Sequence, residues 1–127
     1  MKRHDCMPPP KEHEIQATFI YWVRLAEKTD WRLRLLFAVP NAGKRTRAEA
    51  AWMLAEGLRA GVPDIMLPFP SGPFVGLAIE FKRPGETTSE KQDDYITLLV
   101  DAGWLVVICT DSEAAVRTVQ DYLRQEK

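Results

Sequence analysis

The run from residue 104 to 109 limits the folds open to this chain more than any other feature. Its six residues, Trp-Leu-Val-Val-Ile-Cys, are all apolar. A strand that is apolar on both faces is expected in a sheet that helices cover on both sides. We therefore predict an α/β fold with this strand at the centre of the sheet. Asp111 or Ser112 follows it and can cap a last helix that runs to about Arg124.

Helices are predicted from the spacing of apolar residues and from capping motifs. Apolar residues recur at helical spacing between residues 11 and 28, which predicts an amphipathic helix. Thr46 and Glu49 form a capping box that opens a second helix to about residue 58, and Ser89 and Gln92 form another. The helix that begins at Ser89 is expected to close at Gly103.

Three further strands complete the expected sheet. Residues 31–39 alternate between apolar and polar, which predicts a strand. Residues 64–68 and 74–82 read as two strands joined like a hairpin through the turn at 70–73. The element order is then α-β-α-β-β-α-β-α, a mixed β-sheet flanked by helices. Residues 11–127 are expected to form one domain, preceded by a loose proline-rich arm at residues 1–10.

Composition excludes several classes of protein. The chain has 127 residues, of which 46% are hydrophobic and 28% charged, as in an ordinary folded domain. It has two cysteines, no apolar core of a signal peptide at its start, and no run of about 20 apolar residues. A reducing, cytoplasmic setting is therefore expected, without a membrane span.

The net charge of −1 conceals an asymmetry between the two halves of the chain. Residues 1–47 hold ten basic and five acidic side chains, whereas residues 48–127 hold seven basic and thirteen acidic ones. A basic half can indicate a polyanionic partner, and it can equally be ordinary solvated surface. An acidic half does not argue against nucleic acid, because carboxylates that bind metal count as negative.

Two charged residues in the strand at 74–82 are the first candidates for chemistry. Glu80 and Lys82 share one face of that strand, opposite Ile79 and Phe81. Burying charges in a sheet is costly unless they are paired or bind metal. The alternative is an edge strand whose Glu/Lys face is solvated.

Asp64 is a second candidate, at the start of the preceding strand. A hairpin would bring its carboxylate to the strand beside Glu80. Two carboxylates with a backbone carbonyl suit Mg²⁺ or Mn²⁺. Alternatively, Asp64 is a turn residue that bonds its own backbone after Pro63.

Other polar residues are ambiguous when each is taken alone. Gln92 can simply be the capping residue of its helix, and Glu14 can be a carboxylate that favours a helix N-terminus. The basic cluster Lys44, Arg45 and Arg47 lies at a helix start, where it is either a phosphate contact or a solvated loop.

In chain order, these residues resemble the PD-(D/E)xK nuclease superfamily, and more closely its virus-type replication-repair nuclease branch, the VRR-NUC domain. The resemblance covers roughly residues 12 to 123. Its motifs are Glu14, Pro40-Asn41, Gly61-Val-Pro-Asp64, Glu80-Phe-Lys82 and Ser89-Glu-Lys-Gln92. One departure concerns Tyr95, which follows Gln92 by three residues where related RecB-like enzymes have a spacing of four. The resemblance implies a restriction-endonuclease-like fold.

The resemblance also implies metal-dependent cleavage of DNA. Asp64, Glu80 and the carbonyl of Phe81 would hold Mg²⁺ or Mn²⁺, with Glu14 binding it directly or through water. Lys82 would stabilise charge on the phosphate, and Gln92 would position the site or the scissile backbone. Asn41, Lys44, Arg45 and Arg47 would contact DNA.

Minimal members of this branch are similar to junction resolvases, which implies a homodimer that cleaves branched DNA such as Holliday junctions in a bacterial or phage-infected cell. The residues Tyr21, Trp22, Trp52 and Met53 add to this expectation, because they exceed what the core of a small monomer readily buries. One alternative is a non-catalytic DNA-binding or assembly module that keeps the nuclease fold. Another is an unrelated α/β domain that binds a small phosphorylated ligand.

Overall fold

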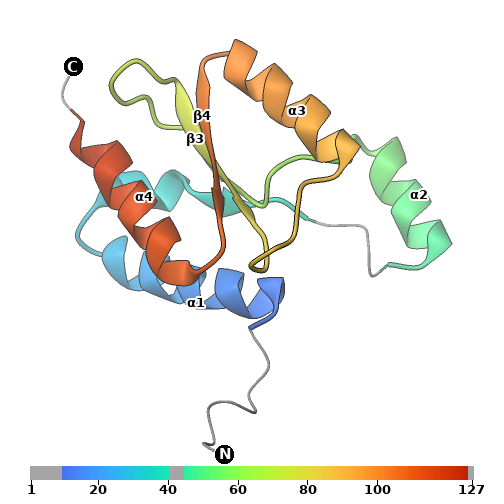
Figure 1. Ribbon diagram of the computed structural model, residues 1–127, viewed down its shortest axis with the longest axis horizontal. Helices are drawn as coiled ribbons and strands as arrows, with labels where there is room; N and C mark the ends of the chain where they lie inside the picture. The colour runs from blue at the N-terminus through green and yellow to red at the C-terminus, as the bar shows by residue number, and fades with distance from the viewer. Residues whose placement is uncertain (1–9, 41–44, 126–127) are drawn as a thin grey trace, which may run out of the picture.

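A computed structural model describes residues 10–40 and 45–125 (Figure 1). The arm predicted for residues 1–10 lies almost wholly outside the described residues. The helices are α1 (Glu12–Ala26), the 3₁₀ helix η2 (Trp31–Leu35), α2 (Arg47–Ala55), α3 (Glu90–Asp101) and α4 (Ser112–Arg124). The strands are β1 (Phe37–Ala38), β2 (Ile65–Leu67), β3 (Gly76–Phe81) and β4 (Trp104–Cys109). The mixed sheet flanked by helices is as predicted.

The four strands lie in the order β1-β2-β3-β4. β1 and β3 run antiparallel to β2, and β4 runs parallel to β3. Every residue of β3 is buried, so the Glu/Lys strand is an interior strand and not a solvated edge. The predicted place of β4 is wrong, because it forms an edge of the sheet. Its run of apolar residues is explained by α3 and α4, which both pack against it.

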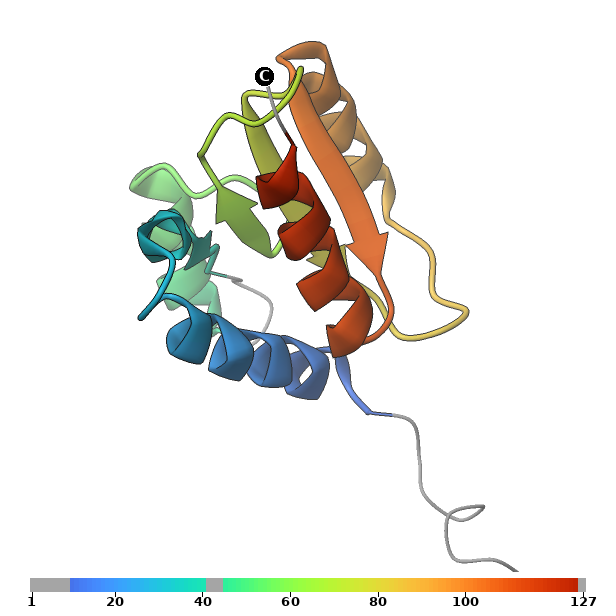
Figure 2. The ribbon, with the colours of Figure 1, turned by 90° about the vertical axis from the view of Figure 1, so that its left-hand side faces the viewer.

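Helices on both faces give the sheet its core (Figure 2). α1 and α4 pack together over one face, where Phe19 lies with Ile79 and Phe81 of β3. α3 covers the other face beside β4. On that side, Gly76 leaves room for an indole, since a Cβ at this position would come within 2.6 Å of the Trp104 ring. Sheet and helices therefore hold β3 from both sides.

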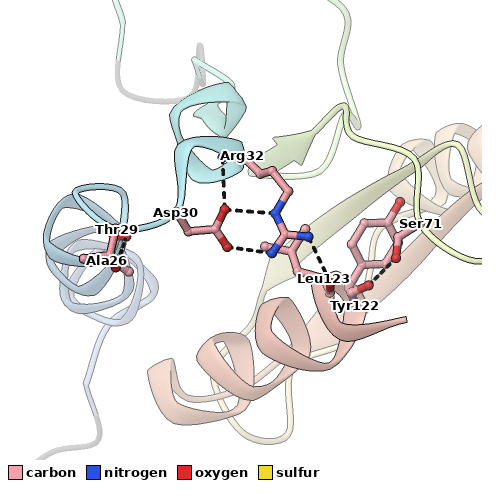
Figure 3. Close-up of polar contacts among 7 residues, drawn as sticks. All are labelled: Ala26, Thr29, Asp30, Arg32, Ser71, Tyr122 and Leu123. Atoms are coloured by element: carbon pink, nitrogen blue, oxygen red, sulfur yellow. Dashed lines mark hydrogen bonds and ion pairs between the residues drawn. The ribbon is translucent and has the colours of Figure 1, made fainter. Parts of the chain in front are cut away.

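The segment predicted as a strand at 31–39 is mostly helical instead. Asp30 caps η2 by accepting a hydrogen bond from the backbone N–H of Arg32 at 3.1 Å. The Arg32 guanidinium donates to both Asp30 carboxylate oxygens and to the carbonyl oxygen of Leu123 at the end of α4 (Figure 3). These contacts favour a tight turn over an extended chain, and only Phe37–Ala38 pairs with β2.

The capping predictions are confirmed. Thr46 and Glu49 cap α2 reciprocally, Ser89 and Gln92 cap α3, and Asp111 caps α4. α2 ends at Ala55, a few residues before the predicted end, and buries none of its side chains. None of the helices in the described ranges is long and apolar enough to cross a membrane.

Candidate active site

Asp64 and Glu80 meet at the end of β3, as the hairpin prediction requires. β2 and β3 pair with Ile65 opposite Ile79, so one residue further along the same register Asp64 stands opposite Glu80. The two carboxyl groups are close enough for the charge of Asp64 to act on Glu80. Asp64 Oδ2 accepts a hydrogen bond from the backbone N–H of Phe81 at 2.8 Å. We call these two side chains the acid pair.

Burial makes the acid pair hold protons more tightly than free carboxyl groups do. Glu80 is only 3% exposed, and its desolvation, together with the charge of Asp64, raises its pKa to about 7. Burial raises the pKa of Asp64 as well, against the hydrogen bond from Phe81. For Glu80, desolvation contributes more to the raised pKa than repulsion from Asp64 does.

Lys82 lies on the same strand face as Glu80. Its Nζ is 3.5 Å from Glu80 Oε2, and its side chain is 12% exposed. Its backbone N–H donates to the carbonyl oxygen of Cys109 at 3.0 Å, so the end of β4 fixes the lysine's backbone. A partly buried ammonium group thus lies next to Glu80 of the acid pair.

The side chain of Gln92 makes two hydrogen bonds, one within its helix cap and one to Glu80. Its Oε1 accepts from the backbone N–H of Ser89 at 2.8 Å, which completes the capping box of α3. Its Nε2 donates to Glu80 Oε2, also at 2.8 Å. The helix cap therefore orients the amide toward Glu80.

The structure does not place Glu14 with the acid pair. Glu14 is exposed, and its Oε1 accepts from the backbone N–H of Lys11 at 2.8 Å as a cap of α1. Glu12 is the α1 carboxylate close enough to interact with Asp64, Glu80 and Lys82.

Glu12 could have been found from the helical pattern. It precedes the buried residues Ile15 and Phe19 by three and seven positions, so it lies on the inner face of α1. Burial and a hydrogen bond with the Glu86 carboxyl group raise the pKa of Glu12 to about 7. Glu86 was not singled out in the sequence; its Oε1 also accepts from the Arg83 backbone N–H at 2.7 Å.

The predicted DNA contacts are only partly described. Arg45 and Arg47 are exposed at the start of α2. Asn41 and Lys44 lie outside the described residues. Tyr95 is half-buried on α3, one turn after Gln92.

The donor set fits a divalent cation in chemistry. In the described part of the chain, no group of three or more His, Cys, Asp or Glu side chains is gathered as a metal cage. The acid pair supplies two hard oxygen donors, and backbone carbonyl and water are the usual complement for Mg²⁺ and Mn²⁺. Burial, and then the charge of Asp64, raise the pKa of Glu80, and positive charge nearby would favour its ionised form. A cation bound there would take the place of the extra proton.

The family follows from comparison with known proteins. A family model described as the VRR-NUC domain matches residues 5–113. The chain belongs to the VRR-NUC domain family. The matched range contains Glu12, the acid pair, Lys82 and Gln92.

A solved structure shows the same fold for a VRR-NUC domain. The protein, "VRR_NUC domain protein", superposes with a TM-score of 0.78 over 95% of this chain and 94% of its own. Sequence identity is 21%, so this likeness concerns the fold alone. No curated protein matches the chain. The VRR-NUC family implies nuclease activity and DNA binding in general.

Proposed function

We propose that this VRR-NUC domain is a metal-dependent, structure-specific endodeoxyribonuclease that hydrolyses phosphodiester bonds in branched DNA such as Holliday junctions. The observation that carries the proposal is the acid pair, in which Glu80 is buried near the end of the interior strand β3 and Asp64 is half-buried beside it, together with Lys82. Buried acids without a packing function are costly to the fold, and such clusters are concentrated at active sites.

Asp64, Glu80 and the Phe81 carbonyl would hold Mg²⁺ or Mn²⁺, which when bound supplies Lewis-acid polarisation of a phosphate and a more acidic water. Glu12 replaces Glu14 as the residue of α1 that would complete this ligand set. The remaining chemistry belongs to the chain. Lys82 stabilises negative charge that develops on the phosphate, because its ammonium group is already positioned on the same strand face.

Gln92 acts as a positioning residue. It holds Glu80 Oε2 by one hydrogen bond while the Ser89 cap holds its own amide oxygen. Both contacts restrict rotation of the Glu80 carboxyl group. A carboxyl group held in a single orientation keeps its oxygens directed at the site, which preserves the geometry of the reaction.

A C2 homodimer is part of the proposal, because symmetric cleavage of a four-way junction needs two cuts related by a two-fold axis. Of the side chains that suggested an interface, Trp22 packs against the core and Met53 is half-buried, whereas Tyr21 is 69% exposed. Leu25, one turn from Tyr21 on α1, is 49% exposed. These two form the apolar surface of α1 that we assign to the contact between copies. A small nuclease of this kind would work in the cytoplasm.

Cleavage assays test the function. The wild type should nick a four-way junction faster than a flap or a linear duplex in Mg²⁺ or Mn²⁺, and Asp64→Asn should abolish nicking. Calorimetry should show weaker metal binding by the same variant. A protein that binds these DNAs but leaves all of them intact would instead be a non-catalytic module with a nuclease fold. Equal cleavage of duplex and junction would refute only the preference for branches.

A further inference from the structure

Helix α2 differs from the other helices of the described residues in having no buried side chain. It makes no extensive contact with any other helix or strand, and Figure 1 shows it apart from the helices that cover the sheet. An isolated helix of nine residues is not stable in water without help. Local interactions must therefore hold α2 in shape.

Two local features stabilise it. Thr46 Oγ1 accepts from the Glu49 backbone N–H at 3.1 Å, and Glu49 Oε1 accepts from the Thr46 backbone N–H at 2.9 Å. Four of the nine residues are alanine, the strongest helix former. Because the helix depends on these features and not on a core, its outward side chains are available to a partner.

The surface of α2 combines an aromatic ring with basic side chains. Trp52 is 72% exposed, and the residues one turn away on its face are Ala48 and Glu49 before it and Ala55 and the exposed Glu56 after it. Arg45 and Arg47 at the start of the helix are exposed. The nearby Glu49 carboxylate is engaged in the cap. Exposed aromatics beside arginines suit nucleic acid, whose bases stack on the ring while its phosphates pair with the cations.

The segment that follows α2 lies against α3 beside the active site. Gly61, with φ of +87°, lies so close to α3 that a Cβ would come within 2.3 Å of the Lys91 carbonyl oxygen. Gln92, the residue after Lys91, donates a hydrogen bond to Glu80. Asp64 follows Gly61 by three positions. DNA bound on α2 would thus lie at a set position relative to the acid pair.

We infer that Trp52 recognises branched DNA by stacking on bases exposed at the branch point, while Arg45 and Arg47 bind the flanking phosphates. This inference rests on the proposed function and names the element that gives it substrate preference. A continuous duplex offers no open base face to an indole, whereas a branch does. The preference for branches then resides in α2, and the hydrolysis resides in the acid pair.

Binding measured without cleavage tests the inference. Fluorescence anisotropy in EDTA would compare a labelled four-way junction with a linear duplex of the same arm sequence. Trp52→Ala should raise Kd for the junction about tenfold and leave the duplex unchanged. Trp52→Phe, which keeps a ring for stacking, should restore most of the affinity. Leu54→Ala, an exposed apolar residue of the same helix that cannot stack, is the matched control and should change neither Kd.

The arginines should behave differently from the tryptophan. Arg45→Ala and Arg47→Ala should weaken junction and duplex alike, and each should reduce the slope of log K against log salt by about 0.9. Trp52→Ala should leave that slope unchanged.

Three results would overturn the inference. Trp52→Ala could bind the junction with the Kd of the wild type, or it could raise the Kd for junction and duplex equally. It could also convert a dimer to a monomer in light scattering, which would make α2 a contact between copies. If Trp52→Ala weakens junction binding as expected but the wild type cleaves no DNA, the nuclease proposal is refuted and this inference stands.

Discussion

Replacing Glu80 by glutamine should make the metal-free protein more stable at pH 8. The variant keeps nearly the same shape but removes the charge that burial opposes. Burial and the neighbouring Asp64 raise the pKa of Glu80 from 4.5 to about 7. The folded state therefore binds this proton more tightly than the unfolded state does. The resulting stability is fully present below pH 4.5 and is lost as the pH rises through about 7.

The size of the effect follows from the shift. At about 1.4 kcal/mol per pKa unit, ionised Glu80 costs the fold at most about 3 kcal/mol at pH 8. The substitution also removes the partner of Lys82, which offsets part of the gain. We expect a net increase of about 1–2 kcal/mol, or roughly 4–8 °C in Tm.

Thermal unfolding in EDTA at pH 8 and pH 5 measures this difference. The difference in Tm between Glu80→Gln and the wild type should be large at pH 8 and nearly absent at pH 5. Glu56→Gln removes an equal charge from an exposed position on the C-terminal side of α2 and controls for net charge. A variant that is less stable than the wild type at pH 8, or a gap independent of pH, would refute the reasoning.

Three further outcomes are expected. Lys82→Ala should lower the single-turnover cleavage rate by a factor of about 10²–10³ while changing DNA affinity little. Lys82→Arg should not restore the rate, because a planar guanidinium is not a compact ammonium. A near-normal rate in Lys82→Ala would mean that the lysine is only an ion-pair partner. Gly76→Val should destabilise the fold by several kcal/mol, about 3 or more, since its side chain would occupy the space of the Trp104 ring; an unchanged urea midpoint would contradict this. Arg32 lowers the pKa of Asp30, so the ion pair stabilises the fold above pH 3.8 and less as the pH falls below it. Asp30→Asn should therefore cost about 0.5–1 kcal/mol at pH 7 and less at pH 3, as thermal unfolding at the two pH values would measure.

Much of the fold could be predicted because local chemistry and global packing agree along most of the chain. The capping boxes at Thr46 and Ser89 begin helices where expected. The turn at 70–73 joins β2 and β3, and their pairing brings Asp64 opposite Glu80. These are short-range features, in which turn and cap residues act on their own neighbours.

The errors concern tertiary context. An apolar strand shows that both of its faces are covered, but not that both of its edges are paired, so β4 looked central while lying at the edge. Residues 31–35 alternate as a strand would, yet Arg32 finds its acceptor on Leu123, 91 positions away. No local pattern can encode that contact.

Of the predicted site residues, the structure brings those on the sheet together but not the glutamate predicted on the first helix. Strand alternation placed Glu80 and Lys82 together, because the period of two leaves no choice of face. On α1, the first turn holds Glu12 and Glu14, and the family resemblance pointed to Glu14. The helical period identifies Glu12, since it shares the face of Ile15 and Phe19.

The double use of Gln92 has a consequence for how substitutions should accumulate in related sequences. Ser89 is an exposed residue that a survey of surface positions would treat as freely exchangeable. Its backbone N–H nevertheless holds the amide oxygen of Gln92, and its hydroxyl caps the Gln92 backbone N–H at 3.2 Å. Replacing the serine would remove the hydroxyl cap of the Gln92 backbone N–H and so loosen the first turn of α3, from which Gln92 restrains Glu80. Positions 89 and 92 should therefore change together or not at all, even though only one of them touches the acid pair.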